Sequence, residues 1–151
     1  MVQEKVFEDE KIFNYVRKIA LGKKNLAEIS AFEVYNEVKL IKNLLIPDSC
    51  DDDDLIFFQV KEYFKEVESG KIFVSEAENS PFEAIENILK KITATTQILM
   101  NIVCEEKIFE TFDINDVTDK IAEKFPDAEI FWSTISDGEI KNKIYVVIVT
   151  D

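Results

Sequence analysis

The sequence of 151 residues contains no histidine, and this absence narrows the chemistry that is open to the chain. Histidine is the commonest general base, a frequent zinc ligand and the usual activator of serine and cysteine nucleophiles. Catalysis would therefore have to rest on carboxylates, lysines or tyrosines. The three glycines are scattered, so the chain also has no glycine-rich phosphate loop. We therefore expect no catalytic centre and no bound cofactor.

Basic residues are scarce as well. The 18 lysines and arginines stand against 31 acidic residues, which gives a net charge of −13. Proteins bind nucleic acids and anionic membrane surfaces largely through clustered lysine and arginine. We therefore expect neither nucleic acid nor a membrane as a partner.

No apolar run approaches the roughly 20 residues of a membrane span, and the N-terminal segment "MVQEKVFEDEKIF" has no signal-peptide pattern. These absences predict a cytoplasmic protein. The two cysteines, Cys50 and Cys104, form no CxxC motif, and without a secretion signal they are expected to be free thiols rather than a disulfide. The lysine- and isoleucine-rich composition is typical of an AT-rich bacterial genome.

The first half of the chain has the periodicity of helices. Residues 5–21 predict one helix that ends at Gly22. Ser30 and Glu33 form a capping box at the start of a second helix, which ends before Pro47. "DDDDLIFFQVKEYFKEVESG" predicts a third helix, with acids at its N-terminus and Gly70 as its stop. The expected buried stripes are Ile12, Val16 and Ile19 in the first helix and Val34, Val38, Ile41 and Leu45 in the second.

After Gly70 the pattern changes to β-α-β-α-β-β. Strands are predicted at "KIFVSE", at "QILMNIVC" and on both sides of a hairpin turn at Asp137-Gly138. Helices are predicted in "SPFEAIENILKKI", capped by Ser80, and in "DINDVTDKIAEKF", capped by Asp113. Their expected buried stripes are Ala84, Ile85, Ile88, Leu89 and Ile92 in the first and Ile114, Val117, Ile121 and Phe125 in the second. The fold class is therefore α/β, of the α+β two-layer kind. We expect a four-stranded mixed sheet, preceded by two to three helices.

These residues resemble the C-terminal domain of the FtsZ family of bacterial tubulin-like GTPases. "QILMNIV" is similar to the family's strand G-V-L-I-N-I-T, and "KNKIYVVIVTD" to its final strand D-E-I-R-V-T-V-I-A-T-G. "ENSPFEAIENIL" is similar to E-N-R-A-L-E-A-A-E-L-A-I, and "FPDAEIFW" to D-P-D-A-N-I-I-F-G. The resemblance implies an FtsZ C-terminal-domain-like unit over residues 30–151, with residues 1–29 as an N-terminal helix that can dock onto it.

The chain departs from the family at the parts that carry catalysis. Nothing in it resembles the nucleotide loop G-G-G-T-G-S/T-G, so we expect the GTPase domain to be missing. In the family, acids in the pattern N-x-D-F-x-D reach the neighbouring subunit's nucleotide in a filament. Aligning "LIFFQVK" with this pattern puts Ile56 and Gln59 where the acids belong. With the gap placed elsewhere, one of residues 51–54 could still supply an acid.

The segment that begins at residue 51 is the expected interaction surface. By resemblance it lies near the filament interface of the family. The acidic run also fits a solvated loop that caps the next helix, and the aromatic residues Phe57, Phe58, Tyr63 and Phe64 also fit a core stripe. Trp132 is expected to pack or to lie half-buried at an edge. The proposed interaction residues are Asp51, Asp52, Asp53, Asp54, Leu55, Phe57 and Phe58.

The second predicted helix raises the question of what covers its apolar stripe. In the two-domain family the equivalent helix is sandwiched between domains, and bare apolar patches of several hundred square ångströms are rare on monomers. The helix at residues 5–21 could cover it within the chain. A second copy or another protein could cover it between chains.

The resemblance and the missing parts predict a non-catalytic binding or regulatory module in cell division. Its partner would be a tubulin-like GTPase, whose filaments it would cap or modulate. The alternatives are a structural or oligomerisation domain that binds itself or an unidentified partner, and an enzyme that uses carboxylates with a metal at residues 51–54.

Overall fold

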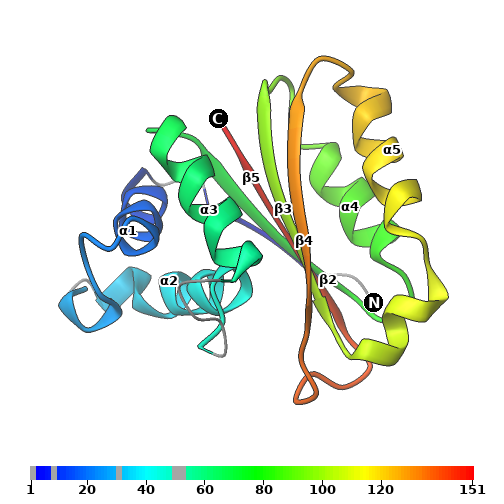
Figure 1. The fold of residues 1–151 in the computed structure, drawn as a ribbon, viewed down its shortest axis with the longest axis horizontal. Coiled ribbons are helices and arrows are strands. Elements are labelled where there is room, and N and C mark those ends of the chain that lie inside the picture. Colours follow the sequence, from blue (N-terminus) through cyan, green and yellow to red (C-terminus); the bar gives the residue numbers. More distant parts are fainter. Residues whose placement is uncertain (1–2, 8–9, 30–31, 49–53) are drawn as a thin grey trace.

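The computed structural model describes residues 3–7, 10–29, 32–48 and 54–151. Figure 1 shows their arrangement as a central sheet with helices on both sides. Two short 3-10 turns, at Leu26–Glu28 and Glu106–Thr111, lie in the connections. The elements in chain order are β1 (Gln3–Phe7), α1 (Glu10–Ala20), α2 (Phe32–Leu45), α3 (Leu55–Glu66), β2 (Lys71–Ala77), α4 (Pro81–Leu89), β3 (Gln97–Cys104), α5 (Ile114–Lys124), β4 (Glu129–Ser136) and β5 (Ile144–Thr150).

The described sheet has five strands in the order β1-β2-β5-β3-β4. The predicted four-stranded mixed sheet is confirmed in β2, β5, β3 and β4, where β3 and β4 are parallel and β5 runs antiparallel to its neighbours β2 and β3. The expected hairpin is wrong, because β5 pairs with β2 and β3 and not with β4. The reason lies in the composition of β5: "IYVVIVT" is a nearly continuous apolar run and is buried almost throughout, which is typical of a central strand.

The single helix expected over residues 5–21 is also wrong. The chain forms β1 first, and α1 begins only at Glu10. β1 pairs antiparallel with β2, from Gln3 opposite Glu76 to Phe7 opposite Ile72. Pairing satisfies backbone groups of the outer edge of β2, so tertiary context overrides the local helical pattern.

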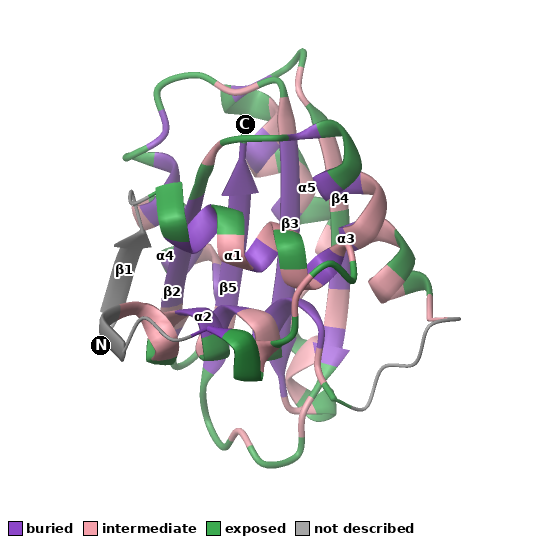
Figure 2. Cartoon of the chain, turned by 90° about the vertical axis from the view of Figure 1, so that its left-hand side faces the viewer, coloured by how far each residue is buried: buried purple, intermediate pink, exposed green. Residues whose placement is uncertain are grey.

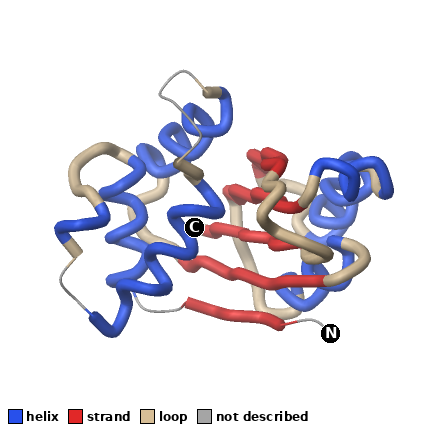
Figure 3. The backbone as a smooth tube through the Cα atoms, turned by 90° about the horizontal axis from the view of Figure 1, so that it is seen from below, coloured by secondary structure: helices blue, strands red, loops and turns tan. Residues whose placement is uncertain are grey.

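The helices α4 and α5 cover one face of the sheet, as the two-layer prediction required, and α1, α2 and α3 form a third layer on the opposite face (Figure 3). On the α4–α5 side the expected stripes are buried except at Ile114, which is half-buried. Ser80 caps α4 by accepting a hydrogen bond from the Phe82 N–H at 3.2 Å, and Asp113 caps α5 by accepting from the Asn115 N–H at 2.9 Å. The buried residues of the predicted stripes are Ala84, Ile85, Ile88, Leu89, Ile92, Val117, Ile121 and Phe125.

On the other face, α1 packs against α2 and α3 in one core with the sheet, and the sheet's inner strands are buried beneath it (Figure 2). Val38, Ile41 and Leu45 of α2 are fully buried, and Val34 is half-buried. The apolar stripe of α2 is therefore covered within the chain. Ser30 and the side chain of Glu33 lie outside the described residues, so the predicted capping box stays a prediction.

Gly70 has a role that the sequence pattern did not indicate. α3 ends at Glu66, four residues before the expected stop. A Cβ added to Gly70 would lie 1.9 Å from the backbone oxygen of Thr150 and 3.0 Å from Cε2 of Phe13. Glycine is required here because the entry to β2 passes close to the end of β5.

Candidate interaction surface

The exposed large hydrophobic side chains of the described residues gather at one edge of the sheet. Leu55 is 67% exposed, Phe58 58% and Trp132 37%. Leu55 and Phe58 lie one turn apart on α3. Trp132 lies on β4, the edge strand that α3 flanks, and points to the opposite face of the sheet from Ser133, which bonds to Gln59 of α3. Exposed apolar groups thus flank this edge from both faces, and exposed apolar groups are a common mark of an interaction site.

A groove of about 410 Å³ separates the start of α3 from β4. Its helix side consists of Leu55, Ile56 and Gln59, and its strand side of residues 130–134. Side chains of successive strand residues point to opposite faces of a sheet. Five consecutive residues can all line the groove only because the open backbone edge of β4 forms part of its wall.

The structure describes only some of the predicted interaction residues. Asp51, Asp52 and Asp53 lie outside the described residues. Asp54 is the N-cap residue of α3, and its carbonyl accepts a hydrogen bond from the Phe58 N–H at 3.0 Å.

The apolar and aromatic residues of α3 differ in their exposure. Leu55 and Phe58 are exposed together, whereas Phe57 packs against the core and the Nζ of Lys61 lies 5.5 Å from its ring centroid. Tyr63 and Phe64 are buried, so the core interpretation holds for these two aromatic residues and not for Phe58.

Ile56 and Gln59, which align with the family's acids, are used in packing. Ile56 is half-buried against the core below α3. The Oε1 of Gln59 accepts a hydrogen bond from the Ser133 hydroxyl at 2.7 Å, and this bond ties α3 to β4. At these two positions the chain presents no carboxylate.

Tyr63 fixes the position of α3 from below. Its hydroxyl lies 3.0 Å from the carbonyl oxygen of Gln97 and 3.1 Å from that of Val149. Burial, with a smaller contribution from the charge of Asp151, raises the pKa of the Tyr63 hydroxyl well above its usual range. The hydroxyl therefore stays protonated and serves as a structural donor.

Sequence reasoning found the α3 part of this surface but missed its β4 part. Trp132 was expected to pack or to lie half-buried at an edge; it lies on the edge strand β4 and is 37% exposed. Its proximity to α3 was not predictable, because the expected hairpin placed β5 beside β4. The missed signal was the three polar residues in "WSTIS" of β4, which contrast with the apolar run of β5.

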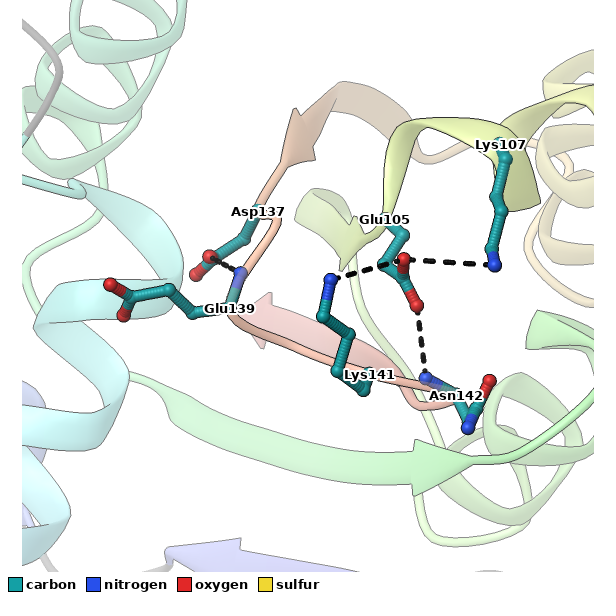
Figure 4. A network of polar contacts seen from close by, with 6 residues as sticks. All are labelled: Glu105, Lys107, Asp137, Glu139, Lys141 and Asn142. Carbon is teal, nitrogen blue, oxygen red and sulfur yellow. Dashed lines mark hydrogen bonds and ion pairs between the residues drawn. The ribbon is translucent and has the colours of Figure 1, made fainter.

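A group of charged and polar residues lies at the loop between β4 and β5 (Figure 4). The Glu105 carboxylate accepts a hydrogen bond from the Asn142 N–H at 3.2 Å and lies 3.6 Å from Nζ of Lys141. The Asn142 N–H, and after it the nearby lysines, hold the pKa of Glu105 below its usual value. Asp137 accepts a hydrogen bond from the Glu139 N–H at 2.9 Å. These carboxylates fix the loop.

The described residues offer little for metal or thiol chemistry. Within them, no group of three or more acidic or cysteine side chains could hold a metal ion. Cys104 is buried, and desolvation, with the nearby charge of Glu105, raises the pKa of its thiol to about 12. Cys50 lies outside the described residues. Across the described ranges, no helix is both long and apolar enough to cross a membrane.

Comparison with known proteins gives matches among solved structures. No protein-family model and no curated protein sequence matches the chain. An FtsZ dimer from M. jannaschii, described as empty, superposes with a TM-score of 0.56 and 18% identity over 91% of this chain and 43% of that one. A tryptophan-to-tyrosine mutant of M. jannaschii FtsZ gives 0.53 and 17% over 82% of this chain and 42% of that one.

At this identity the likeness concerns the fold. The chain spans less than half the length of the FtsZ structures that it matches, as one domain of a larger protein would. The resemblance found in the sequence is therefore confirmed as a resemblance of fold: this chain has an FtsZ-like fold of the C-terminal-domain type.

Proposed function

We propose that the chain is a non-catalytic FtsZ-like module that binds a tubulin-like GTPase and caps or modulates its filaments. It would dock on the nucleotide face of a GTPase subunit, in the place that the next subunit's C-terminal domain would occupy. Fold alone does not determine function, so the proposal rests on the surface at α3.

One observation carries the proposal. The surface that should meet the neighbouring subunit combines exposed Leu55 and Phe58 with Ile56 and Gln59 at the positions aligned with the family's acids. The apolar side chains favour binding, while an amide and an isoleucine cannot polarise an attacking water as a carboxylate does. Such a module would occupy the site without activating hydrolysis.

The test follows polymer mass and GTP turnover in one tube with the FtsZ-type protein of the same organism. The wild-type chain should lower turnover at substoichiometric amounts, because one blocked end affects a whole filament. Phe58→Asp should remove the effect, since it places a charge in the apolar contact without disturbing a buried side chain.

The matched control is Asn79→Asp, which makes the same charge change at an exposed position in the loop after β2. It should act like wild type. Unchanged turnover and polymer mass at a large molar excess of the wild-type chain would contradict the proposal. Equal loss of effect in both variants would contradict the assignment of the surface to α3.

A further inference from the structure

The outer edge of β4 is open in the described part of the chain. β4 lies at the end of the sheet order and pairs there only with β3. Exposed edges are usually blocked by lysine, proline, bulges or inward-pointing charges. Between Ile130 and Ser136, β4 contains neither charge nor proline, although the chain as a whole has 49 charged residues, 18 basic and 31 acidic.

The direction of the free backbone groups follows from two hydrogen bonds at the ends of β4. The Glu129 N–H donates to the Thr96 carbonyl at 2.9 Å, and the Asp137 N–H donates to the Cys104 carbonyl at 2.9 Å. Backbone groups alternate sides along a strand, so odd-numbered residues of β4 face β3. The N–H and C=O groups of Ile130, Trp132 and Thr134 therefore face outward, into the groove beside α3.

We propose that two copies of this chain associate through antiparallel pairing of β4 with β4, around a two-fold axis at Trp132. Rotation about an axis normal to the sheet keeps α3 on the same face in both copies, so paired residues must share parity. In this register Trp132 faces Trp132, Ile130 faces Thr134, and Glu129 faces Ile135. The outward groups of Ile130, Trp132 and Thr134 then exchange hydrogen bonds across the axis.

The three outward-facing residues are symmetric about Trp132, which sets the register, and charge excludes the register centred on Ser133. Like charges directly opposite each other destabilise a strand pair. Centring the pair on Ser133 would set Glu129 of β4 against Asp137, whereas centring it on Trp132 sets Glu129 against the uncharged Ile135. The edge is thus self-complementary in a chain whose net charge of −13 opposes contact between copies elsewhere. The exposed Trp132 ring would be buried against its symmetry mate.

Sedimentation equilibrium on the complete chain tests the proposal. The mass should rise with concentration from 17.5 kDa toward twice that value, about 35 kDa. Trp132→Lys should leave a folded monomer, because it sets lysine against lysine across the axis. Thr134→Lys should do the same, because a lysine on an edge strand blocks pairing. Asn79→Lys carries the same charge change on an exposed loop away from β4 and should dimerise like wild type. Circular dichroism confirms that each variant is folded.

Oxidative cross-linking tests the register in a Cys50→Ala background. Trp132→Cys should form a covalent dimer, because Cα atoms of a hydrogen-bonded antiparallel pair lie about 5.5 Å apart, within disulfide range. Ser136→Cys, four residues from the axis, should not.

A wild-type chain that stays monomeric at high micromolar concentration would overturn the proposal. A dimer that survives Trp132→Lys and Thr134→Lys would contradict the assignment of the interface to the edge of β4. Faster cross-linking of Ser136→Cys than of Trp132→Cys would contradict the proposed register. The inference goes beyond the filament-directed function, and no GTPase enters the experiment, so the two can fail separately.

Discussion

The two faces of the sheet are held in different ways. On one face, α4 and α5 pack through a dense apolar core and are joined to each other by the ion pair between Lys120 and Glu86 at 2.6 Å. On the other face, α1, α2 and α3 also pack through an apolar core, and side-chain hydrogen bonds in addition link the helices to the strands and to one another. They join Tyr63 to β3 and β5, Gln59 to Ser133, Asn101 to the end of α2, and the Arg17 Nε to the Phe64 carbonyl at 2.9 Å.

The difference teaches that apolar burial and orientation are separable. Apolar contacts are non-directional, so the α4–α5 face gains most of its stability from the area it removes from water. Hydrogen bonds are directional and costly to break when buried, so the α1–α3 face is held in one orientation. The candidate interaction surface lies on the face whose geometry is specified by polar contacts.

The largest effect on stability should come from the face covered by α4 and α5. Ile88 is fully buried in α4, and Ile88→Ala should lower the free energy of unfolding by about 2–5 kcal/mol through lost burial and a cavity. Ile88→Val is the matched control and should cost about 0.5–1.5 kcal/mol. Urea denaturation measures both, and a cost for the alanine variant no larger than for the valine variant would contradict this account of the apolar core.

The next largest effect on stability should come from Asn101, which is fully buried on the face covered by α1, α2 and α3. Its Nδ2 donates to the carbonyls of Leu44 and Leu45 at 3.2 and 3.3 Å, where α2 ends and carbonyls lack helical partners. Asn101→Ala should cost about 1–3 kcal/mol. Hydrogen exchange should accelerate in α1–α3 more than in α4–α5, and uniform acceleration would remove the distinction between the faces.

A smaller effect on stability is expected at Gln59. Gln59→Ala removes the hydrogen bond to Ser133 and should cost about 0.5–1.5 kcal/mol. Gln59→Glu keeps an acceptor for the Ser133 hydroxyl and adds the carboxylate that the proposed function finds missing. It should bind filaments as wild type does but restore part of the GTP turnover that the wild-type chain suppresses, because a carboxylate can act as a general base at the blocked end. Turnover no different from wild type would mean that position 59 does not face the nucleotide.

The smallest effect is expected at Asp151, beside the start of β3. Partial burial by itself would raise the pKa of the Asp151 side chain. Hydrogen bonds outweigh burial and lower this pKa to about 2; they come from the Thr95 hydroxyl, the Thr96 hydroxyl and N–H, and the Gln97 N–H. Because folding lowers this pKa, the ionised carboxylate stabilises the folded state fully at pH values above 3.8, the pKa in the unfolded chain. This contribution is lost as the pH falls toward 2. The melting temperature of wild type should therefore fall more steeply between pH 4 and 2 than that of Asp151→Asn. Parallel pH profiles would contradict the role of this carboxylate.

The sequence predicted the buried stripes of the helices better than the pairing of the strands. Periodicity identified the buried stripes of α4 and α5 because each helix packs by its own apolar spacing. It failed at β1, where residues with a helical pattern pair with β2, and at β5, which inserts between β2 and β3. Both errors concern pairing between segments far apart in the chain. The apolar run of β5 indicates a central strand but does not say which strands it pairs with. For the same reason the α3 part of the interaction surface was found and its β4 part was missed.

The measurement that tests the central claim most directly is co-sedimentation with GTP-assembled filaments of the organism's own FtsZ-type protein, with the bound chain counted at saturation. The account predicts that the chain pellets with the filaments, that it saturates far below one copy per subunit, as binding at filament ends requires, and that Phe58→Asp stays in the supernatant. A chain that remains in the supernatant at saturating concentrations, with polymer mass and GTP turnover unchanged, would contradict it.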